Sequence, residues 1–190
     1  AFVDSDDWID SEMYSEMYAL AERESVDAVY CDMVMEYGIS KEYLSYIGNV
    51  NDHRLMYDCL SPITVVYFSL CNRLISREVF INNSLRALNG ANMWEDVELA
   101  VKVRYYAPSS FVINKAYYHY NRTNDNSTTR RKMIERVIGQ VERVKQIEKF
   151  FISQGESQKY KHFISLLKMQ AKCDLFEFDK RMWMNTFNEA

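Results

Sequence analysis

The chain opens on an alternation of short apolar and amphipathic segments, and this alternation limits the folds that it can adopt. Phe2 and Val3 predict the end of a buried strand, residues 11–24 carry apolar side chains at helical spacing, and residues 27–35 form an apolar run typical of a strand. A strand, a helix and a strand in this order indicate an α/β layer. The sequence therefore predicts an α/β fold.

Three acids, Asp4, Asp6 and Asp7, crowd the turn between the first predicted strand and the helix. Asp4 and Asp6 are two residues apart, so in an extended segment their side chains project to the same side. Hard cations such as Mg²⁺ and Mn²⁺ take oxygen ligands and complete their shells with water and substrate phosphates, so only one or two carboxylates need to touch the metal. The cluster predicts a site for a divalent cation.

Two other interpretations explain this cluster less well. Acids favour a helix N-terminus, and Asp10 is expected to cap the helix in this way, but capping leaves three further carboxylates that repel one another. A calcium-binding EF-hand loop fails on spacing, because Trp8 stands at the third ligand position and Ile9 at the position of the turn glycine.

Composition bounds the class of protein. The 190 residues are 48% hydrophobic and can form a core, and the net charge of −4 gives no electrostatic footprint for nucleic acid. Four cysteines lack zinc-ligand spacing and are expected to be buried free thiols: Cys31, Cys59, Cys71 and Cys173. No segment approaches the roughly 20 apolar residues of a membrane span, and no signal pattern opens the chain, so a cytoplasmic setting fits best.

The rest of the chain continues with less regular patterns. Residues 36–60 are polar and rich in turn residues, which predicts a surface loop. The elements expected after it are a short strand and a helical turn within 63–80, a helix from 94 to Pro108, strands at 111–113 and 116–120, a polar loop over 121–128, and amphipathic helices at 129–153 and 156–176. We expect a domain over 1–128 and a helical extension over 129–190.

Glu95 and Asp96 form a second group of acids. They follow Trp94 and open a predicted helix. Taken alone, the pair indicates charge complementarity with a helix N-terminus. The pair lies well downstream of the first cluster. It acquires a second interpretation when the two groups of acids are considered together.

Together with the first cluster, this pair belongs to a set of motifs that resembles glycosyltransferase family 2, of the GT-A fold and the bacterial polysaccharide type. Residues 2–9 look like the family's metal-binding D-x-D element, and residues 94–99 like its E-D motif. Residues 71–80 resemble the stretch W/C-N-K-L-Y-R-R-E-L-F, and residues 118–128 resemble the closing Y-x-Y-x-x-R...N-S-x-T element. The motifs occur in the family's order.

The resemblance implies an inverting enzyme that moves a sugar from a nucleotide-diphosphate donor to a glycan or lipid-linked acceptor, with Mg²⁺ or Mn²⁺ as cofactor. The roles that it implies are metal binding for Asp4 and Asp6, donor-diphosphate binding for Asp4, Asp6, Asp7, Arg122 and Ser127, acceptor binding for Trp94 and Glu95, and proton removal from the acceptor for Asp96. For His119 a structural role in a strand is expected.

The front of the chain departs from the family pattern. The family's first strand, close to V-S-V-I-I-P-x-Y-N, and the Rossmann-like structure that reads the nucleoside have no counterpart here. The chain is therefore expected to be the C-terminal part of a GT-A domain, with weak or no activity alone. Peripheral attachment to the inner membrane face and a homo-oligomer stay open. So do two other classes, a non-catalytic α-helical interaction domain and a metal-dependent phosphotransferase or hydrolase.

Overall fold

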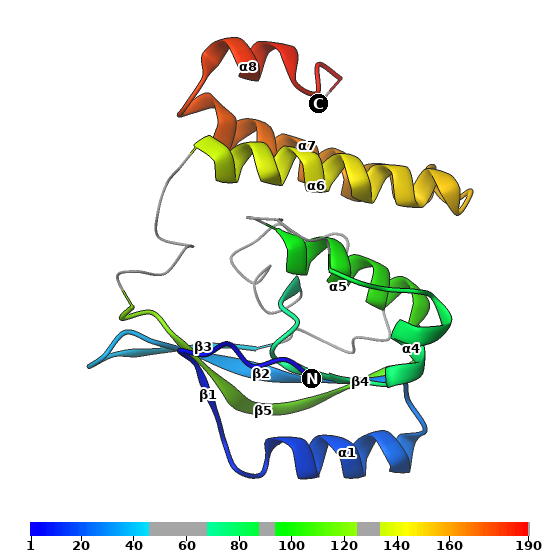
Figure 1. Cartoon of the computed structure of the whole chain (residues 1–190). Coiled ribbons are helices and arrows are strands. Elements are labelled where there is room, and N and C mark those ends of the chain that lie inside the picture. The colour runs from blue at the N-terminus through cyan, green and yellow to red at the C-terminus, as the bar shows by residue number, and fades with distance from the viewer. Residues whose placement is uncertain (46–67, 88–93, 125–133, 190) are drawn as a thin grey trace. The chain divides into compact units, whose positions relative to one another are not determined.

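The computed structural model describes residues 1–45, 68–87, 94–124 and 134–189 of the chain (Figure 1). The chain divides into two compact units. The sheet unit comprises Ala1–Arg86 and Lys102–Arg130, and the helical unit comprises Ala87–Val101 and Arg131–Ala190. A mixed sheet with helices confirms the predicted α/β class, while the predicted domain division between residues 128 and 129 stays a prediction.

A mixed sheet forms the centre of the sheet unit, and the described residues contribute five strands to it. The strands run in the order β1-β5-β2-β3, and β4 pairs with β2 beside this path. Their bounds are β1 (Trp8–Ile9), β2 (Ala28–Glu36), β3 (Lys41–Leu44), β4 (Arg73–Ile75) and β5 (Ser110–Asn121). β2 and β5 are parallel, whereas β1 pairs antiparallel with β5, and β3 and β4 pair antiparallel with β2.

β2 is the best-buried strand of this sheet, because each of its nine residues is buried. Its sequence, Ala-Val-Tyr-Cys-Asp-Met-Val-Met-Glu, is almost continuously apolar. Such a run is typical of a strand that is covered on both faces and paired along both edges. The strand predicted at 27–35 is therefore confirmed, and Glu36 at its end is a buried carboxylate.

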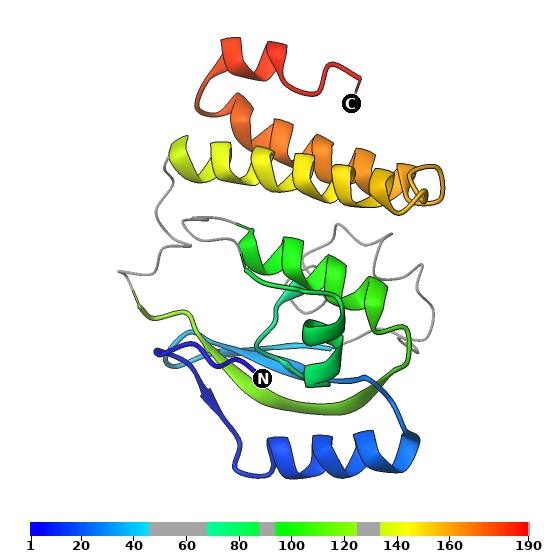
Figure 2. The same ribbon diagram turned by 45° about the vertical axis from the view of Figure 1, so that its right-hand side comes forward.

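α1 (Met13–Glu24) covers one face of the sheet, and α4 (Arg77–Asn82) lies on the opposite side (Figures 1 and 2). Met13, Met17 and Leu20 recur at helical spacing on α1 and are all buried. This apolar stripe lies against β2 and β5. The helix predicted at 11–24 is confirmed.

The first three residues differ from the prediction of a buried strand end. Phe2 and Val3 are 46% and 45% exposed, and the first strand begins only at Trp8. The physical reason is a turn, in which the Asp7 N–H donates to the Asp4 carbonyl oxygen at 3.2 Å. The turn redirects the chain before it can join the sheet, so the predicted strand end is wrong.

The predicted helix cap is also wrong. The residue before α1 is Glu12, and its side chain makes no capping hydrogen bond. Asp10 stays beside β5 because its N–H donates to the Tyr117 carbonyl oxygen at 2.9 Å. This bond keeps Asp10 in line with β1, and its carboxylate faces His119 instead of the helix.

The region predicted as a surface loop over 36–60 contains a strand. β3 forms an antiparallel hairpin with β2, in which Glu36 pairs with Lys41. The hairpin turns at Gly38, whose φ of 84° lies in the left-handed region that favours glycine. Residues 46–60 of the predicted loop, and residues 63–67 of the next predicted segment, lie outside the described residues.

The strands predicted at 111–113 and 116–120 are one strand, β5. Its register with β2 shifts between Cys31, which faces Ile113, and Asp32, which faces Ala116. The two residues between those partners, 114 and 115, interrupt the apolar pattern in the sequence. A local irregularity in the ladder, and not a loop, therefore explains the interruption.

The helical unit contains three helices after residue 133: α6 (Ile134–Ser153), α7 (Lys161–Phe176) and α8 (Lys180–Asn185). Five positions of the predicted α6 stripe are buried, namely Val137, Val141, Val144, Ile147 and Phe151, whereas Ile138 is 37% exposed. α8 was not predicted from the sequence. No described helix, α6 included, is both long enough and apolar enough to cross a membrane.

Two of the cysteines behave as expected. Cys31 and Cys71 are buried free thiols, and burial raises the pKa of each to about 12, so both stay protonated at neutral pH. Cys173 is also a free thiol but is exposed, so the expectation that it is buried is wrong. Cys59 lies outside the described residues.

Candidate functional site

The acidic turn, residues Asp4–Asp7, leads directly into β1 and lies beside the end of β5. β1 pairs with β5 so that Trp8 faces His119 and Ile9 faces Tyr118. Because this pairing is antiparallel, the turn before β1 meets the residues that follow His119 on β5. The sheet therefore brings together two segments whose hydrogen-bonded residues are 111 to 118 positions apart in sequence.

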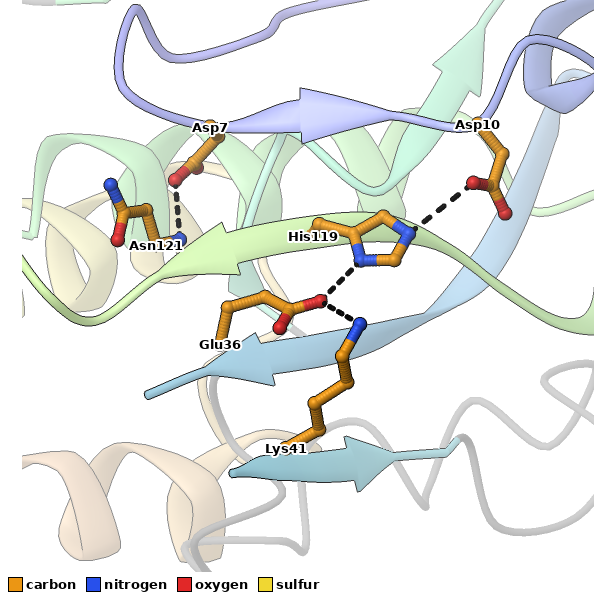
Figure 3. Close-up of polar contacts among 6 residues, drawn as sticks. All are labelled: Asp7, Asp10, Glu36, Lys41, His119 and Asn121. Atoms are coloured by element: carbon orange, nitrogen blue, oxygen red, sulfur yellow. Dashed lines mark hydrogen bonds and ion pairs between the residues drawn. The ribbon is translucent and has the colours of Figure 1, made fainter. Parts of the chain in front are cut away.

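Asp7 is the acid that the protein holds most firmly. The Tyr118 hydroxyl donates to Asp7 Oδ2 at 2.5 Å, and the Asn121 N–H donates to Asp7 Oδ1 at 2.8 Å (Figure 3 shows the second of these bonds). Tyr118 is fully buried, and its hydroxyl oxygen also accepts from the Asp4 N–H at 3.3 Å. One buried phenol thus contacts both ends of the acidic turn.

Asp4 and Asp6 are both exposed on the same turn. Asn124 Nδ2 donates to Asp6 Oδ2 at 2.7 Å, which joins the turn to the segment after β5. Asp4 is held through its backbone, by the Tyr118 contact and by the turn hydrogen bond from Asp7. As whole residues, Asp4 and Asp6 are thus more exposed than Asp7, which is half-buried.

The electrostatics of the turn show that the acids repel one another. Desolvation raises the pKa of Asp4, and the negative charge of Asp6 raises it further. Desolvation also raises the pKa of Asp7, and the charges of Asp4 and Asp6 add to this, although the hydrogen bonds from Tyr118 and Asn121 oppose it. The ionised turn is therefore under electrostatic strain, which a bound cation would relieve.

The donor chemistry of the turn fits a hard cation that brings other ligands with it. No group of three or more His, Cys, Asp or Glu side chains in the described part of the chain is arranged to hold a metal ion. Asp4 and Asp6 nevertheless offer two carboxylates whose charges interact. Mg²⁺ is commonly held by one or two carboxylates plus substrate phosphates. The residues fit such a shared coordination shell better than a shell made by protein alone.

A second polar cluster joins β1 to the centre of the sheet (Figure 3). His119 Nδ1 lies 2.7 Å from Glu36 Oε1, and His119 Nε2 lies 3.3 Å from Asp10 Oδ1. Lys41 Nζ lies 2.8 Å from the same Glu36 oxygen. A ring protonated on Nδ1 donates to Glu36, and an imidazolium donates to both acids. The hydrogen bonds from Lys41 and His119 lower the pKa of Glu36.

The second predicted acid pair lies at the start of α5 (Glu95–Tyr106), in the part of this helix that belongs to the helical unit. Trp94 has φ of 58°, and its carbonyl oxygen accepts from the Glu98 N–H at 3.0 Å. Asp96 is half-buried, and its Oδ1 accepts from the Val97 N–H at 2.8 Å. Glu95 is exposed.

Glu98 fixes this first turn of α5 to α6. Arg143 Nη1 lies 3.0 Å from Glu98 Oε2, and the Glu98 side chain is only 5% exposed. A charge-assisted contact of this kind, shielded from water, orients a helix more strongly than an exposed pair does. Asp96 is therefore carried on a well-anchored helical turn.

The remaining predicted site residues are Arg122 and Ser127. The Arg122 N–H donates to the Glu36 carbonyl oxygen at 2.8 Å, and its guanidinium lies 5.7 Å from the centre of the Tyr120 ring. Arg122 thus continues the pairing between β5 and β2. Ser127 lies outside the described residues. The roles predicted for both residues stay predictions.

The chain shares its fold with S. aureus TarS, as three solved structures of that protein indicate. S. aureus TarS 1-349 in complex with UDP-GlcNAc matches 96% of this chain with a TM-score of 0.64 and 16% identity. TarS 1-349 on its own matches 96% with a TM-score of 0.61 and 17% identity, and its complex with UDP matches 87% with the same score and identity.

These structures are longer than the chain. The chain covers 50%, 48% and 44% of the three TarS chains, so it spans about half of their length. No family model and no curated protein matches the sequence. The likeness therefore concerns the fold.

The residues that support the acidic turn were not predicted from the sequence. Tyr118 and Asn121 contact Asp7, and Asn124 contacts Asp6, whereas the resemblance implies only a diphosphate-binding role for Arg122 and Ser127 of the same motif. Side chains alternate between the two faces of a strand, so Tyr118 and His119 must point to opposite sides of β5. That alternation was readable in the sequence, but the partner segment was not.

We predict that Tyr118→Phe destabilises the protein by about 1.5–3 kcal/mol, because it removes a buried hydrogen bond to a carboxylate. The pKa of Asp7 should also rise further above its ordinary value, since the Tyr118 hydroxyl now lowers it. Urea unfolding measures the first effect and NMR titration the second. The matched control is Tyr18→Phe, which alters a tyrosine that is 61% exposed. Equal stability of the two variants would contradict the assignment.

We predict that Asp4→Asn stabilises the metal-free protein at neutral pH. The pKa of Asp4 is raised on folding, so its stabilising contribution is present at low pH and is lost as the pH rises through that pKa. Asn cannot ionise and avoids this loss. The gain should be at most about 1 kcal/mol, because the side chain is exposed.

This gain should disappear as the pH falls to about 3, where Asp4 is protonated in both states. Thermal or urea unfolding in EDTA from pH 3 to pH 7 measures it. Asp174→Asn, at an exposed acid of the helical unit, serves as the control. A loss of stability at pH 7 in Asp4→Asn would show that the ionised carboxylate is stabilising instead.

Proposed function

We propose that this chain provides the metal-binding and acceptor sides of an inverting family 2 glycosyltransferase that uses a nucleoside-diphosphate sugar. The observation that carries the proposal is the acidic turn, which the buried Tyr118 holds in place within a glycosyltransferase fold. Ionisation of Asp4 and of Asp7 costs stability, because desolvation and neighbouring negative charge raise both pKa values, and groups perturbed in this way are typical of functional sites.

Asp4 and Asp6 are the proposed ligands of Mg²⁺ or Mn²⁺. When bound, the cation neutralises negative charge on the leaving diphosphate as a Lewis acid. Asp7 has a different role, because both of its oxygens already accept hydrogen bonds from the protein. It adds negative charge near the cation and fixes the shape of the turn on which the two ligands stand.

Asp96 is the proposed general base. It takes the proton of an acceptor hydroxyl while that oxygen forms a bond to the anomeric carbon and the bond to the diphosphate breaks on the opposite face, so the configuration inverts. Its carboxylate is half-buried and stands on the helical turn that the contact between Glu98 and Arg143 anchors. Trp94 and Glu95, the residues just before it, are the proposed acceptor contacts.

A uridine-diphosphate sugar is the donor to test first. TarS, which shares the fold, has been crystallised with UDP-GlcNAc and with UDP. Arg122 and Ser127 follow β5 in sequence and supply a cation and a hydroxyl that could contact the diphosphate. A glycan or a lipid-linked glycan is the proposed acceptor, which would place the enzyme at the inner face of a membrane.

We predict that Mn²⁺ binds this chain, that UDP or pyrophosphate tightens its binding, and that Asp6→Asn weakens it at least about tenfold. The physical reason is that Asp6 supplies one of few protein oxygens, so its loss cannot be compensated. Calorimetry with preformed Mn²⁺–UDP and Mn²⁺–pyrophosphate measures the affinities. Pyrophosphate is included because it carries the metal-chelating part of the donor without a nucleoside.

Asp174→Asn is the control for this titration, since it removes an exposed acid of the helical unit and should leave Mn²⁺ affinity unchanged. Binding that is equally weak in both variants would mean that Mn²⁺ associates with acidic surface in general. Absence of Mn²⁺-dependent binding by the unmodified chain to either diphosphate would overturn the metal site.

We predict that Asp96→Asn lowers the rate of sugar transfer by about 10²–10⁴-fold, the range typical for a general base. Its Mn²⁺–UDP affinity should stay the same, because Asp96 does not contact the diphosphate in this proposal. Transfer from UDP-GlcNAc to a glycan acceptor measures the rate, and product analysis separates transfer from hydrolysis. Glu95→Gln is the neighbouring control and should raise the KM for acceptor more than it lowers kcat. Parallel loss of diphosphate binding in Asp96→Asn would indicate a structural role.

A further inference from the structure

The strand that carries the acidic turn into the sheet is very short. β1 has two residues, Trp8 and Ile9, and their partners on β5 are His119 and Tyr118. A strand of this length makes few ladder hydrogen bonds, so side-chain contacts must help to fix its position. Tyr118 provides such contacts to the acidic turn on one side of β5, as described above.

We propose that His119 is a positioning residue that fixes β1, and through β1 the acidic turn, from the other side of β5. The proposal rests on the proposed function of the turn as a cation site. Adjacent residues of a strand point to opposite faces, so His119 and Tyr118 act on β1 from different sides. His119 contacts Trp8, the residue before Ile9, and Asp10, the residue after it.

The contacts of His119 are specific in geometry. Its ring stacks on the Trp8 indole, with ring centres 5.2 Å apart and planes inclined by 10°. Its Nε2 lies 3.3 Å from Asp10 Oδ1. Trp8 and Asp10 are two residues apart and project to the same face, which allows one imidazole ring to contact both. A side chain without a flat ring and two polar edges could not make both contacts.

His119 is itself fixed to the centre of the sheet. Its Nδ1 lies 2.7 Å from Glu36 Oε1 at the end of β2, and its side chain is 13% exposed. Glu36 is held in turn by Lys41 of β3, whose Nζ lies 2.8 Å away (Figure 3). Glu36 lies on the best-buried strand, and its side chain is 6% exposed. The contacts thus run from β3 through β2 and β5 to β1.

The consequence concerns the geometry of the turn. Binding sites lose function when their ligands move by more than about 0.5 Å. Asp7 directly precedes Trp8, so a shift of β1 along or away from β5 would displace the carboxylates relative to Tyr118 and Asn121. His119 acts on the acids through Trp8 and Asp10, which is why we describe it as a positioning residue and not as a ligand.

The test compares His119→Ala with the conservative His119→Gln and with the control Lys115→Ala. Lys115 is also on β5, but it pairs with Glu16 of α1 at the surface, with 2.6 Å between Nζ and Oε2. The first readout needs no metal. It is amide hydrogen exchange at Asp10 and Asn121, whose N–H groups donate to Tyr117 and to Asp7 respectively.

We expect His119→Ala to speed exchange at both amides by at least about tenfold, because the pairing of β1 opens locally. Amides of β2, such as Cys31, should exchange as in the unmodified protein. His119→Gln should recover part of the protection, since an amide nitrogen can still donate to Glu36. Lys115→Ala should change neither amide.

The second readout is Mn²⁺ affinity, which we expect to fall about tenfold in His119→Ala and not in Lys115→Ala. If the unmodified protein binds no Mn²⁺, the proposed function fails, but the exchange data still decide the role of His119. Unchanged exchange at Asp10 and Asn121 in His119→Ala would overturn the proposal, as would equal effects in Lys115→Ala. Should His119→Ala not fold, Glu36→Gln replaces it, with faster exchange at the same two amides expected and unchanged exchange contradicting the proposal.

Discussion

The contact between the Tyr118 hydroxyl and the Asp7 carboxylate is the interaction on which the candidate site depends. It joins a turn at the start of the chain to a strand more than a hundred residues later, and it is made by a fully buried phenol. Burial raises the pKa of Tyr118, so the hydroxyl stays protonated and keeps its role as donor. Without this contact, the repulsion among Asp4, Asp6 and Asp7 would favour a more open turn.

In this site, hydrogen bonds hold a turn whose acids repel one another. Desolvation and the charges of neighbouring acids raise the pKa values of Asp4 and Asp7, whereas the hydrogen bonds from Tyr118 and Asn121 act in the opposite direction on Asp7. A chain that only needed a turn would gain stability from neutral residues there. Retaining three carboxylates on a supported turn is typical of a site whose charge is used in binding or catalysis. The same logic applies to Glu36, a buried carboxylate that two cationic or polar partners hold at the end of β2.

Local patterns predicted most elements but few of their boundaries and none of the contacts between them. Periodicity identified α1, β2 and the α6 stripe, because each buries a face that repeats at a fixed spacing. It failed for Phe2 and Val3, which are apolar but exposed and outside any strand. It also failed for β3, because the residues Lys41 to Leu44 are too polar to predict a strand. β3 forms because β2 offers it an edge, and an edge is a property of the sheet.

The sequence by itself determined the class of fold, the two groups of acids and the chemistry that such acids can perform, because residue type and spacing are local properties. The tertiary structure alone decided which acid has both carboxylate oxygens hydrogen-bonded within the protein and which acids are exposed. Asp7 differs from Asp4 and Asp6 only because antiparallel pairing of β1 with β5 places Tyr118 and Asn121 beside it. The contacts of His119 were decided in the same way. Trp8 belongs to β1, Asp10 directly follows β1, and Glu36 ends β2. Pairing between distant segments depends on the whole sheet, and no local pattern contains it.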